Sequence, residues 1–322
     1  MTVLVTGARG FLGGAVVRAL LERGYAVRTF QRGRSELDGV DERRGSVADR
    51  GAVDAAMDGV DAVVHLAAKV SFHGRPSEFD DVNITGSANV VSAARAAGVE
   101  RFVFVSTPSV AHAGDSLVGV GAGRADPDRA RGDYARTKAV AELAALAADS
   151  AAMPIVAVRP HIVWGPGDTQ LVARVVDRAK AGRLPLLGHG AALIDTTYVD
   201  NAADAIVAAL RRVPDVHGEA FVVSNGEPRP VGDLLADICT AAGAPAPTLR
   251  VPAALARAAG GVVERVWRVR PGTDEPPMTR FLAEQLSTAH WFDQRRTREA
   301  LAWRPRVSLD QGIERLAAYY AR

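Results

Sequence analysis

The stretch Gly7-Ala8-Arg9-Gly10-Phe11-Leu12-Gly13 follows an apolar run at residues 3–5 and opens an apolar helical pattern at residues 15–21. Gly7 can form a tight turn, Gly10 lets the backbone approach phosphates, and Gly13 lets the helix pack closely on the strand. The free N–H groups and the dipole at such a helix start attract a diphosphate. Glycine spacing alone is a weak signal, but the strand and helix around it indicate a dinucleotide-binding turn.

A second pattern, Tyr134-Ala135-Arg136-Thr137-Lys138, lies in a segment predicted to be helical from about residue 133 to 148. The four-residue spacing puts the phenol and the ammonium on one helix face. We expect the cation to lower the pKa of Tyr134, which suits a proton donor near neutral pH. Such pairs also occur on solvated helix faces. The preceding apolar strand, which ends in Ser106-Thr107-Pro108-Ser109, favours a catalytic role.

Buried strands are predicted where short apolar runs alternate with helical patterns, at residues 3–5, 26–30, 62–66, 102–105 and 155–158. This alternation predicts a parallel sheet with helices on both faces. Ligands bind such sheets beyond the carboxyl ends of the strands, so the motifs that follow these strands should converge there.

Two later regions are less regular. Residues 114–131 are rich in Gly, Asp and Arg and predict a loop beside the active site. Residues 251–269 predict one or two apolar helices with scattered charges.

The composition is typical of a soluble globular protein, with 322 residues of which 48% are hydrophobic and 24% charged. A net charge of +2 does not indicate the strongly basic surface that nucleic-acid binding requires. The single cysteine, Cys239, excludes an internal disulfide and is expected in the core. The histidines show no metal-ligand spacing, and we find neither a signal-peptide pattern nor an apolar run of about 18 residues. We therefore expect a cytoplasmic protein without a metal.

Together these features resemble the extended short-chain dehydrogenase/reductase family, in its 3β-hydroxysteroid dehydrogenase-like branch. The motifs that carry the resemblance are, in chain order, Gly7/Gly10/Gly13, residues 59–68, residues 82–89, Val105-Ser106-Thr107, Tyr134/Lys138, residues 159–167, residues 198–200 and residues 300–305. The resemblance implies an α/β fold with a Rossmann-type doubly wound parallel sheet and a smaller C-terminal substrate-binding lobe. The sheet domain would comprise residues 1–164 and about 191–225, and the lobe about 165–190 and 226–322.

The same resemblance implies the site residues. Thr107, Tyr134 and Lys138 would be catalytic, with Ser109 as an alternative to Thr107. Asn83 would hold a local backbone or water network, although an ordinary loop asparagine is nearly as good an interpretation, and His65 would be structural or near the cofactor. The residues expected to bind the cofactor are Gly7, Arg9, Gly10, Phe11, Leu12, Gly13, Arg32, Arg34, Leu66, Ala67, Ala68, Asn83, Tyr134, Lys138, Pro160, Ile162 and Val163.

The end of the second strand indicates which nicotinamide cofactor is used. NAD-preferring sites place an acidic residue there, but this chain has Gln31 followed by Arg32. A guanidinium binds a 2′-phosphate with bidentate geometry, so we expect NADPH/NADP⁺, with Arg9 and Arg34 assisting Arg32. The alternative is a solvated charged loop. Ser46 stands where the family often has an acidic residue near the adenine.

The C-terminal third indicates the substrate. Residues 275–282 and 287–293 resemble the 3β-hydroxysteroid dehydrogenase-like branch. Within that branch, residues 107–110 and 276–281 resemble most closely bacterial reductases of long-chain olefin formation, which convert a 2-alkyl-3-keto acid to the 2-alkyl-3-hydroxy acid. A 3β-hydroxysteroid dehydrogenase is the nearest alternative, and a nucleotide-sugar epimerase or dehydratase is a further one. The expected partners are a hydrophobic small molecule, a second copy in a homodimer and other enzymes of the pathway, with no nucleic acid and no transmembrane segment.

Overall fold

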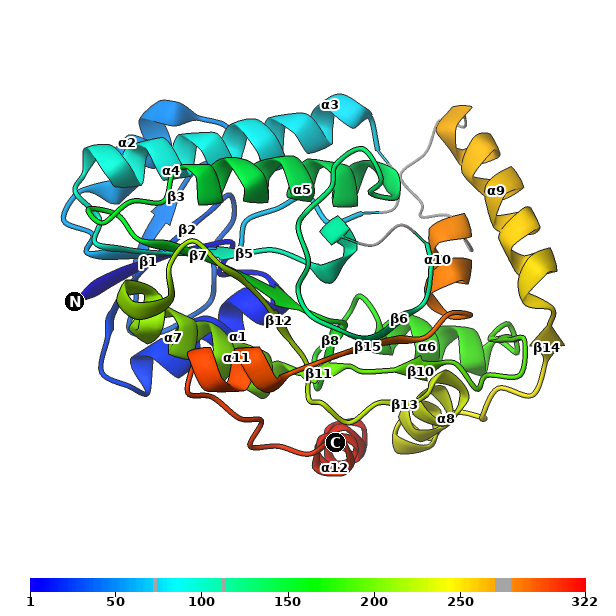
Figure 1. Ribbon diagram of the computed structural model, residues 1–322. Coiled ribbons are helices and arrows are strands. Elements are labelled where there is room, and N and C mark those ends of the chain that lie inside the picture. The colour runs from blue at the N-terminus through cyan, green and yellow to red at the C-terminus, as the bar shows by residue number, and fades with distance from the viewer. Residues whose placement is uncertain (72–73, 112–113, 270–278) are drawn as a thin grey trace.

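The computed structural model describes residues 1–71, 74–111, 114–269 and 279–322. Of the segment 275–282, which the sequence relates to the substrate, residues 275–278 lie outside the described residues. Figure 1 shows a large sheet between two layers of helices, with α9 and α10 at one side of the molecule.

The large sheet has seven parallel strands in the order β12-β7-β5-β4-β1-β2-β3. Its strands are β1 (Thr2–Thr6), β2 (Ala26–Gln31), β3 (Asp41–Arg44), β4 (Ala62–His65), β5 (Arg101–Val105), β7 (Ile155–Pro160) and β12 (Ala220–Val223). The predicted parallel α/β sheet is therefore confirmed, and all five predicted strands are present. The edge strand β3 has four charged residues and no apolar pattern, so its sequence gave no strand signal.

Helices cover both faces of this sheet (Figure 1). One layer contains α2 (Arg50–Met57), α3 (Pro76–Phe79), α4 (Gly86–Ala96) and α5 (Gly132–Ala147), with a π-helical segment at Asp80–Thr85 between α3 and α4. The other contains α1 (Phe11–Leu21), α7 (Val199–Val216) and α11 (Arg295–Ala300). Apolar side chains of the strands alternate between two buried clusters, one under each layer, as expected for a sheet covered on both faces.

The remaining elements form a smaller region beyond the carboxyl ends of the strands. A four-stranded sheet has the order β13 (Arg229–Pro230), β10 (Leu193–Ile194), β15 (His290–Phe292) and β6 (Leu117–Val120). Two short pairs are β11 (Thr197–Tyr198) with β8 (Val163–Trp164), and β14 (Arg250–Val251) with β9 (Leu186–Leu187). The helices here are α6 (Val172–Lys180), α8 (Val231–Ala241), α9 (Ala253–Val269), α10 (Arg280–Gln285) and α12 (Leu309–Tyr320).

Two expectations for the irregular regions are now resolved. Residues 114–131 are not loop throughout, because Leu117–Val120 forms β6 and pairs with β15. That pairing joins segments about 170 residues apart and leaves no local pattern. Residues 253–269 form one helix, and Gly260 allows α10 to approach it: a Cβ there would lie 2.6 Å from the Arg280 nitrogen.

Cys239 is buried in the core, as expected. Among the described residues, no helix combines the length and apolar content needed to cross a membrane.

Candidate functional site

The glycine turn lies against the loop that follows β4. Gly7 has a φ of +75°, and a Cβ there would lie 2.9 Å from the Ala67 nitrogen. The Thr6 hydroxyl accepts the N–H groups of Leu66 and Ala67, each at 3.1 Å. Two segments about 60 residues apart are thereby held at the carboxyl edge of the sheet, where a dinucleotide binds this fold.

Basic side chains surround the end of β2. The Arg9 guanidinium lies beside Gly33, since a Cβ at Gly33 would be 2.8 Å from Arg9 Nη1. Arg32 and Arg34 are exposed in the same loop. Gln31 is buried, and its Oε1 has no hydrogen-bond partner among the described residues. The residues therefore fit a dinucleotide: the glycines leave room for it, and an acceptor and cations lie where its adenosine end would bind.

A pocket of about 420 Å³ opens beside the turn. Gly10 and Phe11 line it from the start of α1, and Pro166 and Asp200 line it from the smaller region and α7. Leu12 and Gly13 lie in the first turn of α1, and Gly13 packs against the backbone of Gly7 and Ala8.

The hydroxyl groups that follow β5 meet the first turn of α5. Thr107 and Tyr134 share a side-chain hydrogen bond. The Thr107 and Ser109 hydroxyl oxygens are 3.0 Å apart. Burial raises the pKa of Tyr134 to about 12, and the bond with Thr107 opposes part of that shift. The phenol therefore keeps its proton at neutral pH.

Lys138 lies one turn further along α5 and is buried. Its Nζ donates to the Val105 carbonyl at 2.8 Å and lies 4.1 Å from the centroid of the Phe104 ring. Burial lowers the pKa of Lys138 to about 7, while the Glu142 carboxylate acts in the opposite direction. The expectation that Lys138 lowers the pKa of Tyr134 was wrong for this arrangement, because the ammonium bonds the Val105 carbonyl and burial dominates the phenol.

A buried ion pair that the sequence did not reveal supports this helix. Glu142 follows Lys138 by four residues, and its carboxylate forms a two-pronged pair with Arg159, with Arg159 Nε donating at 2.9 Å. Both side chains are 1% exposed. Arg159 also donates to the carbonyls of Ala122 and Gly123, so it joins α5 to the segment beside the site. In the sequence, the four-residue spacing from Lys138 was the one indication that Glu142 lies on the same helix face.

Asn83 and His65 are both buried in local hydrogen-bond networks. Asn83 accepts the Lys69 N–H at 2.7 Å and donates to the Lys69 carbonyl and the Thr137 hydroxyl. The ring nitrogens of His65 lie 2.8 Å from the Thr6 hydroxyl and 3.0 Å from that of Ser87. Burial, aided by the charge of Lys138, lowers the pKa of His65 to about 3, so the ring is neutral. These contacts tie the β4 loop, which includes Ala68, to β1 and to the helix layer that contains α4 and α5.

The segment after β7 crosses toward the smaller region. Pro160 ends β7, and the Ile162 carbonyl accepts the Thr197 N–H at 3.1 Å. Val163 then pairs with Thr197. Ile162 has a φ of +42°, which is strained for a β-branched residue and typical of functional positions.

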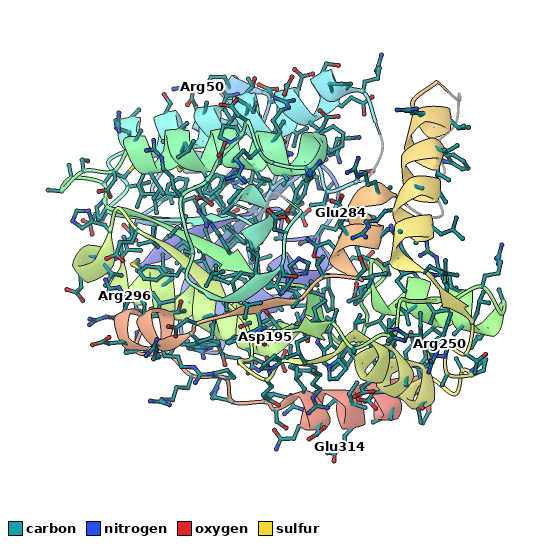
Figure 2. The ribbon with its side chains drawn as sticks, turned by 45° about the vertical axis from the view of Figure 1, so that its right-hand side comes forward. Arg50, Asp195, Arg250, Glu284, Arg296 and Glu314 are labelled. Atoms are coloured by element: carbon teal, nitrogen blue, oxygen red, sulfur yellow. The ribbon has the colours of Figure 1, made fainter. Side chains whose placement is uncertain are left out.

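In the smaller region, α10 carries a buried carboxylate. Glu284 is 5% exposed and pairs with Arg280 at 2.9 Å. A Cβ at Gly114 would lie 3.1 Å from Glu284 Oε2 and 3.2 Å from Arg131 Nη2. Figure 2 shows Glu284 on the side of α10 that faces away from α9. Sequence patterns did not indicate Glu284, because Gly114 and Arg131 come near it only in the folded chain.

The chain is similar to several known proteins over most of its length. Residues 3–224 match the model of the NAD dependent epimerase/dehydratase family. A 2-alkyl-3-oxoalkanoate reductase from Stenotrophomonas maltophilia is 42% identical over 326 residues, which cover 99% of each chain. A 3 beta-hydroxysteroid dehydrogenase/Delta 5-->4-isomerase from Mycobacterium tuberculosis is 31% identical over 99% of this chain and 90% of that protein. The crystal structure of gox2253 matches with a TM-score of 0.80 and 25% identity, covering 99% of this chain and 98% of that one.

Proposed function

The chain belongs to the NAD dependent epimerase/dehydratase family, within the extended short-chain dehydrogenases/reductases, and we propose that it reduces a 2-alkyl-3-oxo acid to the 2-alkyl-3-hydroxy acid with NADPH. It is an NAD(P)-dependent oxidoreductase. The substrate class is supported by the printed name of the relative from Stenotrophomonas maltophilia, which aligns over nearly the whole of both chains. A place in long-chain olefin formation is part of the same proposal.

The observation that carries the proposal is the group of Thr107, Tyr134 and Lys138 at the end of β5. A hydroxyl and a phenol share a hydrogen bond, and a buried lysine follows on the same helix face. When bound, the nicotinamide cofactor supplies the hydride. Thr107 would hold the carbonyl oxygen, and Tyr134 would deliver a proton to that oxygen as negative charge develops on it. The raised pKa of Tyr134 keeps this proton available at neutral pH.

The preference for NADPH rests on charge. Gln31 leaves the end of β2 without a carboxylate that would repel a 2′-phosphate, and Arg9, Arg32 and Arg34 surround it. Replacing Arg32→Ala should raise the KM for NADPH by about tenfold, the value of one charge-assisted contact, and leave the KM for NADH nearly unchanged. Equal changes for both cofactors would contradict this assignment.

The first experiment measures NADP⁺ reduction with a long-chain 2-alkyl-3-hydroxy acid, beside a 3β-hydroxysterol. The oxidative direction is preferable because free β-keto acids lose carbon dioxide. Turnover of the branched acid alone would establish the proposal. Turnover of the sterol alone would favour the second candidate, a 3β-hydroxysteroid dehydrogenase, for which the 31% identical relative provides support. A nucleotide-sugar epimerase would show neither reaction and would convert a sugar nucleotide instead.

A further inference from the structure

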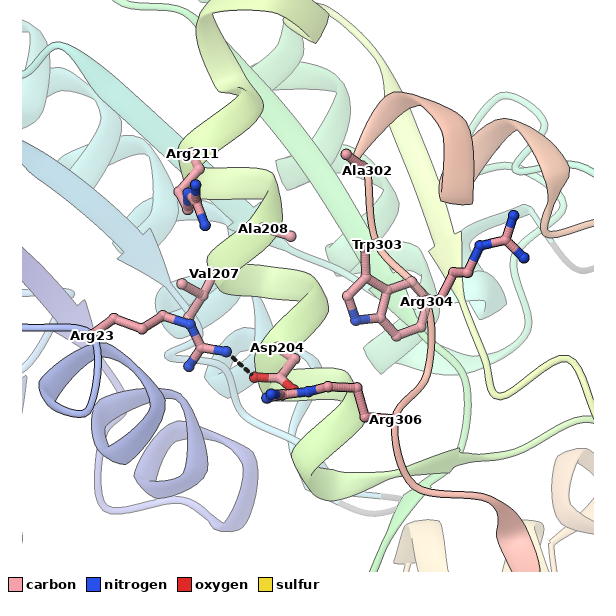
Figure 3. A pocket seen from close by; sticks show the side chains of 9 residues that line it. All are labelled: Arg23, Asp204, Val207, Ala208, Arg211, Ala302, Trp303, Arg304 and Arg306. Atoms are coloured by element: carbon pink, nitrogen blue, oxygen red, sulfur yellow. Dashed lines mark hydrogen bonds and ion pairs between the residues drawn. The ribbon is translucent and has the colours of Figure 1, made fainter.

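A second pocket lies at the opposite end of α1 from the glycine turn, beside the middle of α7. It measures about 260 Å³ and is bounded by the end of α1, the middle of α7 and the segment that precedes α12 (Figure 3). The cofactor turn meets the start of α1 at Phe11, whereas this pocket meets Arg23, just beyond its last residue. Eleven helical residues span about 16 Å, so the two pockets are separate.

Positive charge dominates the lining of this pocket. Its charged side chains are Arg23, Arg211, Arg304, Arg306 and Asp204, four guanidinium groups against a single carboxylate. Asp204 is already shared, because Arg23 Nη2 donates to its Oδ1 at 2.5 Å and Arg306 Nε donates to its Oδ2 at 2.8 Å. Arg211 and Arg304 have no hydrogen-bond or ion-pair partner in the part of the chain that the structure describes.

An unpaired buried donor lies at the same place. The side chain of Trp303 lines the pocket and is 6% exposed, and its Nε1 has no hydrogen-bond acceptor among the described residues. Figure 3 shows the indole nitrogen on the side of Asp204 and Arg306. Buried N–H groups in native proteins nearly always have an acceptor, so this one indicates a group that the chain itself does not supply.

We propose that this pocket binds a phosphate-class oxyanion, either free phosphate or diphosphate or the phosphate end of an organic ester. Guanidinium groups recognise phosphate oxygens in bidentate fashion, and an anion here would balance the excess positive charge. Its oxygens would also provide the acceptor that the Trp303 indole lacks. The pocket has room for one or two phosphate groups, so the organic part of an ester would remain outside. This site is independent of the proposed reductase activity.

The test is a calorimetric titration of the full chain with orthophosphate, pyrophosphate and ADP, in saturating NAD⁺, which occupies the glycine turn and carries no terminal phosphate. Tryptophan fluorescence is recorded in parallel. We expect saturable binding of at least one ligand, and at least tenfold weaker binding in the Arg211→Gln/Arg304→Gln variant. Trp303→Phe should remove the fluorescence change. Binding of ADP at least as tight as that of pyrophosphate would identify an organic phosphate as the source, and tighter pyrophosphate or orthophosphate binding would identify the free ion.

The matched control is Arg183→Gln/Arg265→Gln, which removes the same charge from exposed arginines outside the pocket. The control should bind as the unmodified protein does. Equal weakening in both double variants would show a general charge effect and overturn the site. The absence of saturable binding by all three ligands in the unmodified protein would also overturn it, whatever the reductase assay shows.

Discussion

At the carboxyl edge of the large sheet, polar side chains are buried and held by partners, whereas helix α9 presents apolar side chains to solvent. Asn83 and Lys138 are at most 2% exposed and each makes a defined hydrogen bond. On α9, Leu255 is 61% exposed and Val262 is 60% exposed. Packing and hydrogen bonds therefore fix the positions of Asn83 and Lys138, whereas Leu255 and Val262 are largely open to solvent. Substitutions at the carboxyl edge should therefore affect turnover and stability far more than substitutions of the exposed side chains on α9.

The largest effect is expected at Tyr134. Tyr134→Phe removes the phenolic proton and keeps the ring, so turnover should fall by about 10²- to 10⁴-fold, the usual contribution of a general acid. NADPH affinity, measured by fluorescence titration, should remain within about twofold. A variant that retains turnover would contradict the assignment of Tyr134 as the proton donor.

Glu142→Gln tests whether the anchoring of this edge matters for stability. Loss of the carboxylate leaves Arg159 as an uncompensated buried cation, so the free energy of unfolding should fall by about 3–5 kcal/mol. Urea denaturation measures this change. The double variant Glu142→Gln/Arg159→Met removes both charges and should recover part of the loss. If the free energy of unfolding of Glu142→Gln falls by no more than about 1 kcal/mol, the value typical of an exposed pair, then this pair does not anchor the edge.

Lys138 provides a pH test of the same edge. Burial lowers its pKa to about 7, below the value of about 10.4 in an unfolded chain. Between these values the unfolded chain binds more protons than the folded one, so this lysine's contribution to stability rises with pH from about 7 to 10. Thermal melts give the Tm of the unmodified protein and of Lys138→Met at pH 7 and 9. The Tm of the unmodified protein relative to that of the variant should be higher at pH 9 than at pH 7. A constant difference would mean that the pKa is ordinary.

The smallest effect is expected on α9, measured against a matched buried valine. Val103 is fully buried in the large sheet, whereas Val262 is 60% exposed. Val103→Ala should lower the free energy of unfolding by about 1–3 kcal/mol, since it removes buried methyl groups and leaves a cavity. Val262→Ala should change it by no more than about 0.5 kcal/mol. Equal losses would show that α9 is covered by another surface in solution, and the comparison would fail.

Sequence patterns predicted those elements whose structure depends on residues that are close together in the chain. The glycine turn, the five strands first expected and the helix that carries Tyr134 and Lys138 each depend on residues close together in sequence. Strand β6 and the Arg159–Glu142 pair were missed because each depends on a partner brought near by the fold. The domain boundaries and the roles of the site residues remain predictions.

The alternation of the five apolar strands with helices, the glycine turn and the spacing of Tyr134 and Lys138 were determined by the sequence alone, because periodicity and glycine placement act within one βα unit. The protonation of these groups was decided by the tertiary structure. Burial beside Phe104 and Val105 lowers the pKa of Lys138, and burial raises that of Tyr134, although spacing alone suggested a lowered pKa for the phenol. Desolvation depends on everything packed around a charge, and that environment exists only once distant segments have come together.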